Sequence, residues 1–215
     1  MAIIERLWYP PTGSGWRALP GRVLVFCLLP LSRLFRAVAV SRYRRYHDDV
    51  ASGNILRPSV PVIVVGNISV GGTGKTPVVI ALLEQLRCMG FSPGVVSRGY
   101  GGRPEQLPLL VETTTQAPEC GDEPLLIHTR TGCPVVVDPD RPNAIRHLLS
   151  HTEINIVVSD DGLQHYQMYR DLELAIVDGI RGLGNGRCLP AGPLREPPER
   201  LQTVDAVLVN GGDPS

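Results

Sequence analysis

The residue in this sequence that points most directly to chemistry is its single lysine. Lys75 lies in the segment Gly71-Gly72-Thr73-Gly74-Lys75-Thr76, whereas the other twenty strong cations are all arginines. Arginine has a planar fork that suits bidentate pairing, but lysine is a compact charge on a thin stem. A glycine-rich turn lets backbone N–H groups point at phosphate oxygens, and only the thinner side chain fits inside such a turn. The segment therefore predicts a loop that binds a chain of phosphates.

The residues on both sides of this loop are typical of a strand and a helix. The run Val60–Val65 is apolar and rich in β-branched residues, which predicts a buried strand. After the loop, apolar residues recur at helical spacing until Gly90, which is a typical residue to end a helix. The whole pattern matches the nucleotide-binding motif G-x-x-x-x-G-K-[ST], in which the last hydroxyl binds magnesium. We therefore predict that Thr76 is a magnesium ligand and that nucleotide contacts come from Ser69, Val70, Gly71, Gly72, Thr73, Gly74, Lys75 and Thr76, with Ser69 standing where the motif has its first glycine.

From residue 60 onward, predicted strands alternate with predicted helices. This alternation indicates an α/β fold of the P-loop nucleoside triphosphate hydrolase type, with a mainly parallel sheet and helices on both faces. We expect residues 60–215 to form this domain and residues 1–59 to form a separate N-terminal arm. The expected strands are 61–65, 94–97, 134–137, 154–159, 173–177 and 205–209, and the expected helices are 75–89, 122–130 and 141–150.

The arm is predicted to be an amphipathic helical segment at a membrane surface. It carries nine arginines and three acidic residues, whereas the formal net charge of the whole chain is zero. The apolar stretch Val23–Leu31 contains Pro30 and is too short to span a bilayer, which takes ~20 apolar residues. Apolar residues at helical spacing, flanking arginines and the aromatic residues Trp8, Tyr9 and Trp16 are typical of an interfacial helix. A helix packed on its own domain is the alternative.

Acidic residues follow two of the predicted strands. Asp160 and Asp161 end one strand, and Asp178 ends the next. The carboxyl ends of strands in such sheets face the ligand crevice, and an acidic residue there can hold the magnesium ion of a bound nucleotide. The doubled pair, followed by Gly162 and His165, is the favoured site, although an Asx turn after a strand also explains each acid.

Two further segments carry candidate functional residues. Arg98 follows a short strand and is a candidate phosphate contact. Asp122 opens a predicted helix, where it serves equally well as a helix cap or as a functional acid. The five cysteines are scattered and lack C-x-x-C spacing, which argues against a disulfide framework or a zinc site and suits a reducing compartment. His147 and His151, four residues apart, fit a solvated helix end better than a metal pair.

Five motifs of this sequence, taken in their order along the chain, resemble those of the tetraacyldisaccharide 4'-kinases, the lipid A kinases of Gram-negative bacteria. The resemblance extends from the arm to the last residue and rests on Gly66-Asn67-Ile68-Ser69-Val70-Gly71-Gly72-Thr73-Gly74-Lys75-Thr76-Pro77, Ser97-Arg98-Gly99-Tyr100-Gly101, Gly121-Asp122-Glu123-Pro124, Asp160-Asp161-Gly162-Leu163-Gln164-His165, and Gly184-Asn185-Gly186 with Leu189-Pro190-Ala191-Gly192-Pro193-Leu194-Arg195-Glu196.

This resemblance implies ATP-dependent, magnesium-dependent phosphorylation of the 4'-hydroxyl of a tetraacylated glucosamine disaccharide 1-phosphate, giving lipid IV-A. It implies Asp122 as the general base, Lys75 as a catalytic residue, and magnesium held by Thr76, Asp160 and Asp161. Candidate substrate contacts are Arg98, His165, Asn185 and Arg195. The expected partners are the lipid acceptor and the anionic cytoplasmic face of the inner membrane, with neither nucleic acid nor an obligate protein partner.

The same resemblance raises one expectation about length. Family members are usually longer, so we expect a further C-terminal portion that completes a second subdomain and supplies a histidine near the catalytic acid.

The residues by themselves leave two other functions open. A regulatory P-loop ATPase or GTPase usually has a second lysine before the glycine pair, where this chain has Val70. The other is a membrane protein that binds nucleotide without turnover.

Overall fold

The computed structural model describes residues 7–9 and 19–212. Seven strands form one sheet in the order β3-β4-β2-β5-β1-β6-β7. By internal contacts the chain divides into two compact units, one formed by residues 1–48, 67–73 and 175–215, and the other by residues 49–66 and 74–174. We call them unit 1 and unit 2 and describe them separately. Trp16, which we assigned to the arm, lies outside the described residues.

Unit 2 contains the parallel centre of the sheet. Its strands are β1 (Val62–Gly66), β2 (Pro93–Ser97), β3 (Leu109–Leu110), β4 (Val135–Val137) and β5 (Ile156–Asp160). β5 lies between β1 and β2, and β2 also pairs with β4, all in parallel, while the short β3 is antiparallel to β4. Every residue of β1, β2, β4 and β5 is buried, as expected for strands covered on both faces.

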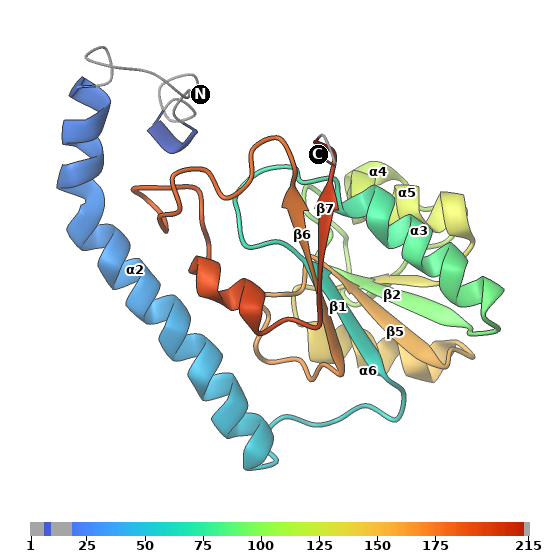
Figure 1. Ribbon diagram of the computed structural model, residues 1–215. Coiled ribbons are helices and arrows are strands. Elements are labelled where there is room, and N and C mark those ends of the chain that lie inside the picture. The colour runs from blue at the N-terminus through green and yellow to red at the C-terminus, as the bar shows by residue number, and fades with distance from the viewer. Residues whose placement is uncertain (1–6, 10–18, 213–215) are drawn as a thin grey trace. The chain divides into compact units, whose positions relative to one another are not determined.

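Helices cover both faces of the sheet in unit 2. They are α3 (Lys75–Cys88), α4 (Ala117–Cys120), α5 (Asp122–Thr131) and α6 (Arg141–His151). Figure 1 shows α3, α4 and α5 on one side of these strands and α6 on the other. The predicted fold class is therefore confirmed. β3 and α4 were not predicted, because two and four residues are too short to show a period.

Unit 1 contains most of a long N-terminal helix, α2 (Leu19–Ala51), and the carboxyl-terminal part of the chain. That part comprises the end of β6 (Leu172–Asp178), the 3₁₀ helix η2 (Pro198–Gln202) and β7 (Ala206–Asn210). Three contacts connect α2 to the segment before β7. Ser32 Oγ donates to the Cys188 carbonyl at 2.7 Å. Arg36 pairs with Glu199 at 3.1 Å, and the Arg200 guanidinium lies 4.5 Å from the Tyr43 ring centroid.

The structure changes our description of the arm. α2 continues through Pro30 and is 33 residues long. A proline inside a helix removes one hydrogen bond and its ring crowds the preceding turn, but leucine, a strong helix former, lies on both sides of Pro30. By length and composition, Val23–Ala51 could cross a membrane, and only 6% of its most apolar window is buried. The expectation that the apolar stretch Val23–Leu31 is too short for a membrane span is therefore not met by the helix that contains it.

Candidate active site

The predicted functional residues of unit 2 lie at one edge of its sheet. β1, β2 and β5 run parallel, so their carboxyl ends meet at the same edge. Arg98 follows the end of β2, and Asp160 ends β5. The helix α3 begins at Lys75, close after the end of β1. This is the edge at which ligands bind in open α/β sheets, and the positive end of the α3 dipole favours an anion there.

Lys75 is paired with the second acid of the doubled motif. Its Nζ atom lies 3.5 Å from Asp161 Oδ1, and its side chain is only 11% exposed. Asp161 has φ = 50°, so its backbone is in the left-handed region. That conformation is uncommon for a residue other than glycine and is found where the surrounding structure imposes it, often at functional sites. The chain thus holds the Asp161 carboxylate beside the lysine at a cost in local strain.

Asp160 is a buried carboxylate with an incomplete set of partners. The residue is 2% exposed, and Ser97 Oγ donates to its Oδ2 at 3.4 Å. Among the described residues, nothing forms a hydrogen bond to its Oδ1. Burial, followed by the charge of the nearby Glu123 carboxylate, raises the pKa of Asp160 to about 6. An orphaned buried acceptor requires an explanation, and a bound cation or its water would satisfy it.

These residues fit a magnesium ion. Magnesium prefers oxygen ligands and keeps several of its waters, so it needs only one or two carboxylates from the protein. Asp160 and Asp161 supply carboxylates, and Thr76 supplies a hydroxyl in the first turn of α3. The described residues contain no group of three or more His, Cys, Asp or Glu side chains that could hold a metal ion.

A buried arginine that the sequence analysis missed supports this edge. Arg141, the first residue of α6, is 1% exposed. Its Nη1 donates to the Asp138 carbonyl at 3.0 Å, and its Nη2 donates to the Asp160 carbonyl at 2.9 Å. It therefore ties the end of β5 to the residue that follows β4. Burial lowers the pKa of Arg141 to about 10, so the guanidinium stays charged at neutral pH.

Two of the recognised motifs pack against one another through glycines. A Cβ atom on Gly99 would lie 3.0 Å from the Cys120 carbonyl oxygen, and one on Gly121 would lie 2.6 Å from the Tyr100 carbonyl oxygen. Only glycine permits such close backbone contact. The loop that carries Arg98 is therefore fixed beside the start of α5, where Asp122 is located. Asp122 is exposed, and its helix is capped by Gly121 without a side-chain hydrogen bond, so the helix-cap role considered for Asp122 is not observed.

His165 and Asp178 have clear local environments. Burial, followed by the charges of Arg141 and Arg98, lowers the pKa of His165 to about 4, so its ring is neutral at pH 7. Asp178 Oδ1 accepts hydrogen bonds from the backbone N–H groups of Ile180 and Arg181 at 2.9 and 3.0 Å. This is the Asx turn that we considered as the alternative explanation for an acid after a strand.

In unit 1, the first half of the glycine-rich loop is held by a second predicted motif. Val70 N–H donates to the Pro193 carbonyl at 2.8 Å, and Arg195 N–H donates to the Ile68 carbonyl at 2.6 Å. Asn185 Nδ2 donates to the Ala191 carbonyl at 2.8 Å and so shapes the same motif. The contacts of Arg195 and Asn185 with a substrate stay predictions, as do those of Arg98 and His165.

Comparison with known proteins identifies the family. The family model described as tetraacyldisaccharide-1-P 4'-kinase (LpxK) matches residues 24–215. The chain belongs to this kinase family. The curated tetraacyldisaccharide 4'-kinase of Azotobacter vinelandii is 54% identical over 214 residues, which cover 98% of the chain and 61% of the relative. That of Aeromonas hydrophila is 50% identical, with coverages of 99% and 60%.

A solved structure of the same kinase family agrees with the fold. The chain resembles the crystal structure of LpxK from Aquifex aeolicus in complex with ATP, with a TM-score of 0.75 and 33% identity. The similarity covers 87% of this chain and 59% of that one. The chain thus spans about three fifths of the length of the kinases that it matches. The nucleotide in the Aquifex aeolicus structure is the ligand that the glycine-rich loop predicts.

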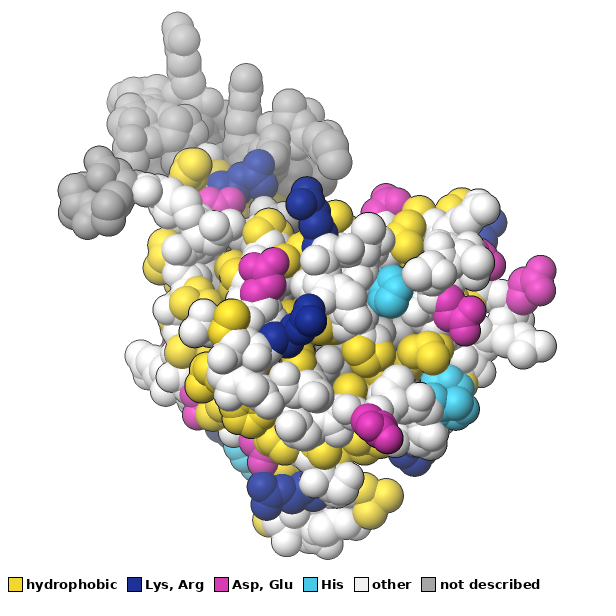
Figure 2. Space-filling model, turned by 90° about the vertical axis from the view of Figure 1, so that its right-hand side faces the viewer, with side chains coloured by type: hydrophobic (Ala, Val, Ile, Leu, Met, Phe, Trp, Pro, Cys, Tyr) yellow, Lys and Arg dark blue, Asp and Glu magenta, His cyan; other side chains and the backbone are white. Residues whose placement is uncertain are grey.

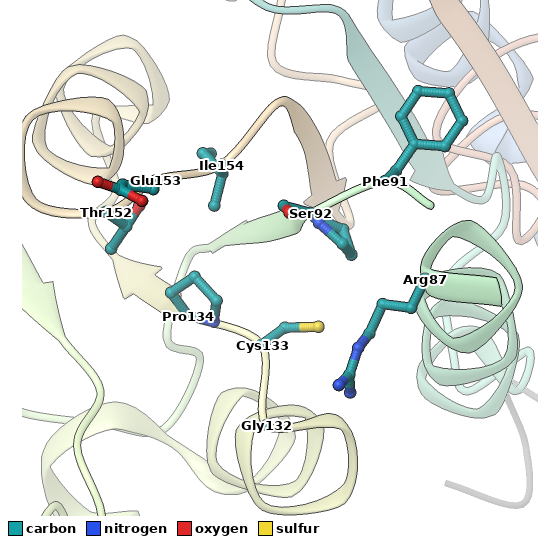
Figure 3. A pocket seen from close by; sticks show the side chains of 10 residues that line it. Arg87, Phe91, Ser92, Gly132, Cys133, Pro134, Thr152, Glu153 and Ile154 are labelled. Atoms are coloured by element: carbon teal, nitrogen blue, oxygen red, sulfur yellow. The ribbon is translucent and has the colours of Figure 1, made fainter. Parts of the chain in front are cut away.

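A separate cavity of about 300 Å³ lies away from the kinase motifs. It is located in unit 2 at the amino ends of β2, β4 and β5, and Figure 3 shows side chains such as Arg87, Cys133 and Thr152 around it. Asp160 lies at the opposite end of β5. On the face drawn in Figure 2, charged and histidine side chains are scattered among apolar ones rather than gathered by sign. The cavity is therefore not part of the candidate active site.

The pKa of Asp160 predicts a stability effect. The folded protein holds this proton more tightly than the unfolded chain, since the pKa rises from 3.8 to about 6. The free energy of unfolding therefore falls as the pH rises through this range. Asp160→Asn should match the wild type near pH 4 and, without magnesium, be more stable at pH 7.5 by on the order of 3 kcal/mol. Thermal unfolding at both pH values measures this, and equal stabilities at pH 7.5 would contradict it.

Proposed function

We propose that the chain binds ATP and magnesium and transfers the γ-phosphoryl group to the 4'-hydroxyl of a tetraacylated glucosamine disaccharide 1-phosphate, giving lipid IV-A. The observation that carries this proposal is the Lys75–Asp161 pair at the amino terminus of α3, beside the buried Asp160. It occurs in a chain whose relatives are named tetraacyldisaccharide 4'-kinases. A lysine and two acids at this position match the requirements of phosphoryl transfer from a nucleotide.

Each group has a defined role in this mechanism. Lys75 and the amides of the loop 69–74 bind the β- and γ-phosphates and hold the γ-phosphorus in line with the acceptor. Thr76, Asp160 and Asp161 would hold magnesium, which would neutralise charge on the phosphates. Asp122 accepts the proton of the sugar hydroxyl as its oxygen bonds to the γ-phosphorus, while the bond from that phosphorus to the β–γ bridging oxygen breaks and ADP leaves. Its exposed position at the start of α5 leaves the carboxylate accessible to an acceptor.

Four polar residues are our candidates for contacts with the lipid acceptor. Arg98 and Arg195 would bind its 1-phosphate or the transferring group, since arginine pairs bidentately with phosphate. His165, neutral at pH 7, and Asn185 would form hydrogen bonds to the sugars. Substituting each of the four residues in turn and comparing the KM values for ATP and for the lipid would separate acceptor contacts from nucleotide contacts.

Single-turnover transfer from γ-labelled ATP tests the activity. The proposal predicts label in the disaccharide lipid, at a rate that requires magnesium. Release of labelled phosphate without labelled lipid would favour a regulatory ATPase instead. Binding of ATP with neither product would favour a membrane protein that binds nucleotide without turnover. Because the chain spans about three fifths of its relatives, the assay should include a chimera in which this chain replaces the matching segment of the Azotobacter vinelandii kinase.

We further propose that α2 attaches the protein to the cytoplasmic face of the inner membrane. Seven large apolar side chains on this helix are exposed, each by at least 36%: Val23, Leu24, Phe26, Leu31, Leu34, Phe35 and Val38. Arginines line the same segment, and basic residues attract anionic lipid headgroups. An apolar stripe with flanking arginines supports membrane binding, and the acceptor's acyl chains could then remain in the bilayer.

Removal of residues 1–45 should release the protein from vesicles containing phosphatidylglycerol and weaken the use of lipid acceptor, while ATP binding persists. Binding of the intact chain should also weaken as salt rises, because salt screens exposed charges. Co-sedimentation with vesicles measures both effects. A double variant with Phe26→Asp and Leu34→Asp keeps the helix and should bind as poorly as the deletion. Leu56→Asp, at an exposed residue outside α2, is the matched control, and vesicle binding that survives the deletion would disprove membrane attachment by the arm.

A further inference from the structure

The carbonyl of Thr73, in the glycine-rich loop, is held by a residue from the far end of the chain. Asn210 Nδ2 donates to the Thr73 carbonyl at 3.0 Å, across 137 residues of sequence. Asn67, which follows β1 and is fully buried, donates from its own Nδ2 to Thr73 Oγ1 at 3.1 Å. All three residues belong to unit 1. Two carboxamides therefore hold one loop residue, one at its side chain and one at its backbone.

The backbone around Asn210 is fixed by a close approach of two strand ends. Gly179 N–H donates to the Asn210 carbonyl at 2.9 Å, immediately after β6. A Cβ atom on Gly179 would lie 1.9 Å from the Gly211 carbonyl oxygen, so only glycine fits at this position. The ends of β6 and β7 are thus in direct backbone contact. The Asn210 side chain extends from a backbone whose position is defined.

The bond to Thr73 determines the orientation of a peptide group in the loop. A trans peptide is planar, so the carbonyl of Thr73 and the N–H of Gly74 point in opposite directions. A carbonyl bound to Asn210 therefore turns the Gly74 N–H away from β7. A loop that binds phosphate needs its N–H groups toward the ligand and its carbonyls away from it. If the peptide lacked this hydrogen bond and flipped, it would present its carbonyl oxygen to the phosphates in place of an N–H donor.

We propose that Asn210 is a positioning residue of the nucleotide site, which fixes the Thr73–Gly74 peptide so that the Gly74 N–H faces the phosphates of ATP. The inference rests on the proposed function and deepens it, because it adds to the site a residue outside every motif that the family resemblance uses. It acts through the loop and does not touch the reacting atoms. Its removal impairs the binding of phosphates and leaves the binding of the nucleoside unchanged.

Asn210→Asp is the sharpest test, because aspartate has the same shape but cannot donate to the Thr73 carbonyl at neutral pH. Asn210→Ala removes the side chain. Val209→Ala changes the exposed neighbour on β7, and Lys75→Ala is the reference for a lost phosphate contact. Calorimetric titration of each variant with magnesium-ATP and with adenosine, which has no phosphate, gives the ratio of the two affinities.

We expect both Asn210 variants to bind ATP about three- to tenfold more weakly, the effect of about one hydrogen bond, with adenosine affinity unchanged. Val209→Ala should bind both ligands like the wild type. The ratio of the two affinities is measured on folded protein, so a residue with only a structural role would leave it unchanged. If the Asn210 variants keep the wild-type ratio while Lys75→Ala binds ATP weakly, this inference alone is overturned. Normal ATP binding by Lys75→Ala would instead overturn the nucleotide site of the proposed function, and this inference with it.

Discussion

Replacement of Lys75 by arginine should remove most ATP binding although the positive charge remains. Its Nζ atom lies 3.5 Å from Asp161, and only 11% of the side chain is exposed. A planar guanidinium needs more room than an ammonium group and prefers a bidentate partner. Loss of a charge-assisted contact to phosphate corresponds to about 10- to 100-fold weaker binding. Titration with magnesium-ATP measures this loss, and the transfer assay should show a parallel defect.

A second variant at this position separates charge from shape. Lys75→Met keeps the thin stem and removes the charge, so it should also bind ATP weakly, in this case because the charge is lost and not because the side chain is too bulky. If both variants fail, the loop requires a lysine in shape and in charge. Near-normal ATP binding and transfer by Lys75→Arg would show that any cation suffices, and would remove the argument that links the only lysine of the chain to its function.

Replacement of Asp122 by asparagine should lower the rate of phosphoryl transfer by ~10²- to 10⁴-fold, the usual effect of losing a positioned general base. ATP affinity should change little, because we assign this residue to the acceptor. The side chain is exposed and does not cap α5, so folding should be nearly unaffected. The rate is best measured in the chimera with the Azotobacter vinelandii kinase, by single-turnover transfer under saturating ATP.

Asp161→Asn provides the contrast for this experiment. Its carboxylate faces Lys75, so its defect should appear in the magnesium dependence and be partly relieved at high magnesium. If Asp122→Asn instead shows reduced stability with a normal rate per folded molecule, the catalytic assignment is wrong. If both variants respond to magnesium in the same way, the separation into a base and a metal ligand is wrong.

Local sequence patterns were sufficient for the main elements of this fold. All six predicted strands are present, as β1, β2, β4, β5, β6 and β7. Short apolar runs predicted the fully buried β1, β2, β4 and β5, and they also predicted β6 and β7, although every residue of β7 is exposed. α3, α5 and α6 were predicted within about two residues, because helical spacing and capping residues are local signals. The glycine-rich loop was equally easy to locate, since the motif consists of contiguous residues in a fixed order, and its role in binding phosphate stays a prediction.

We judged the apolar stretch Val23–Leu31, which contains Pro30, too short for a membrane span, but the helix that contains it is long and apolar enough for one. The effect of one missing hydrogen bond depends on whether the flanking residues continue the helix, and here they do so to Ala51. The very short β3 and α4 were missed for a different reason. β3 exists through its pairing with β4, and the four residues of α4 are too few to show a helical period.

The sequence alone determined the class of fold and, through five ordered motifs, the family, and it located the loop that we propose binds phosphate. Only the tertiary structure decided which residues support these groups. In the sequence, Arg141 is an ordinary helix residue, and only the structure shows that its guanidinium donates to the Asp160 carbonyl. Asn210 is likewise an ordinary residue at a strand end, and only the structure shows that its amide donates to the Thr73 carbonyl. Both act on backbone carbonyls far away along the chain, and a backbone carbonyl has the same chemistry at every residue. No residue pattern can therefore specify such a partner, which exists only once the sheet has brought the segments together.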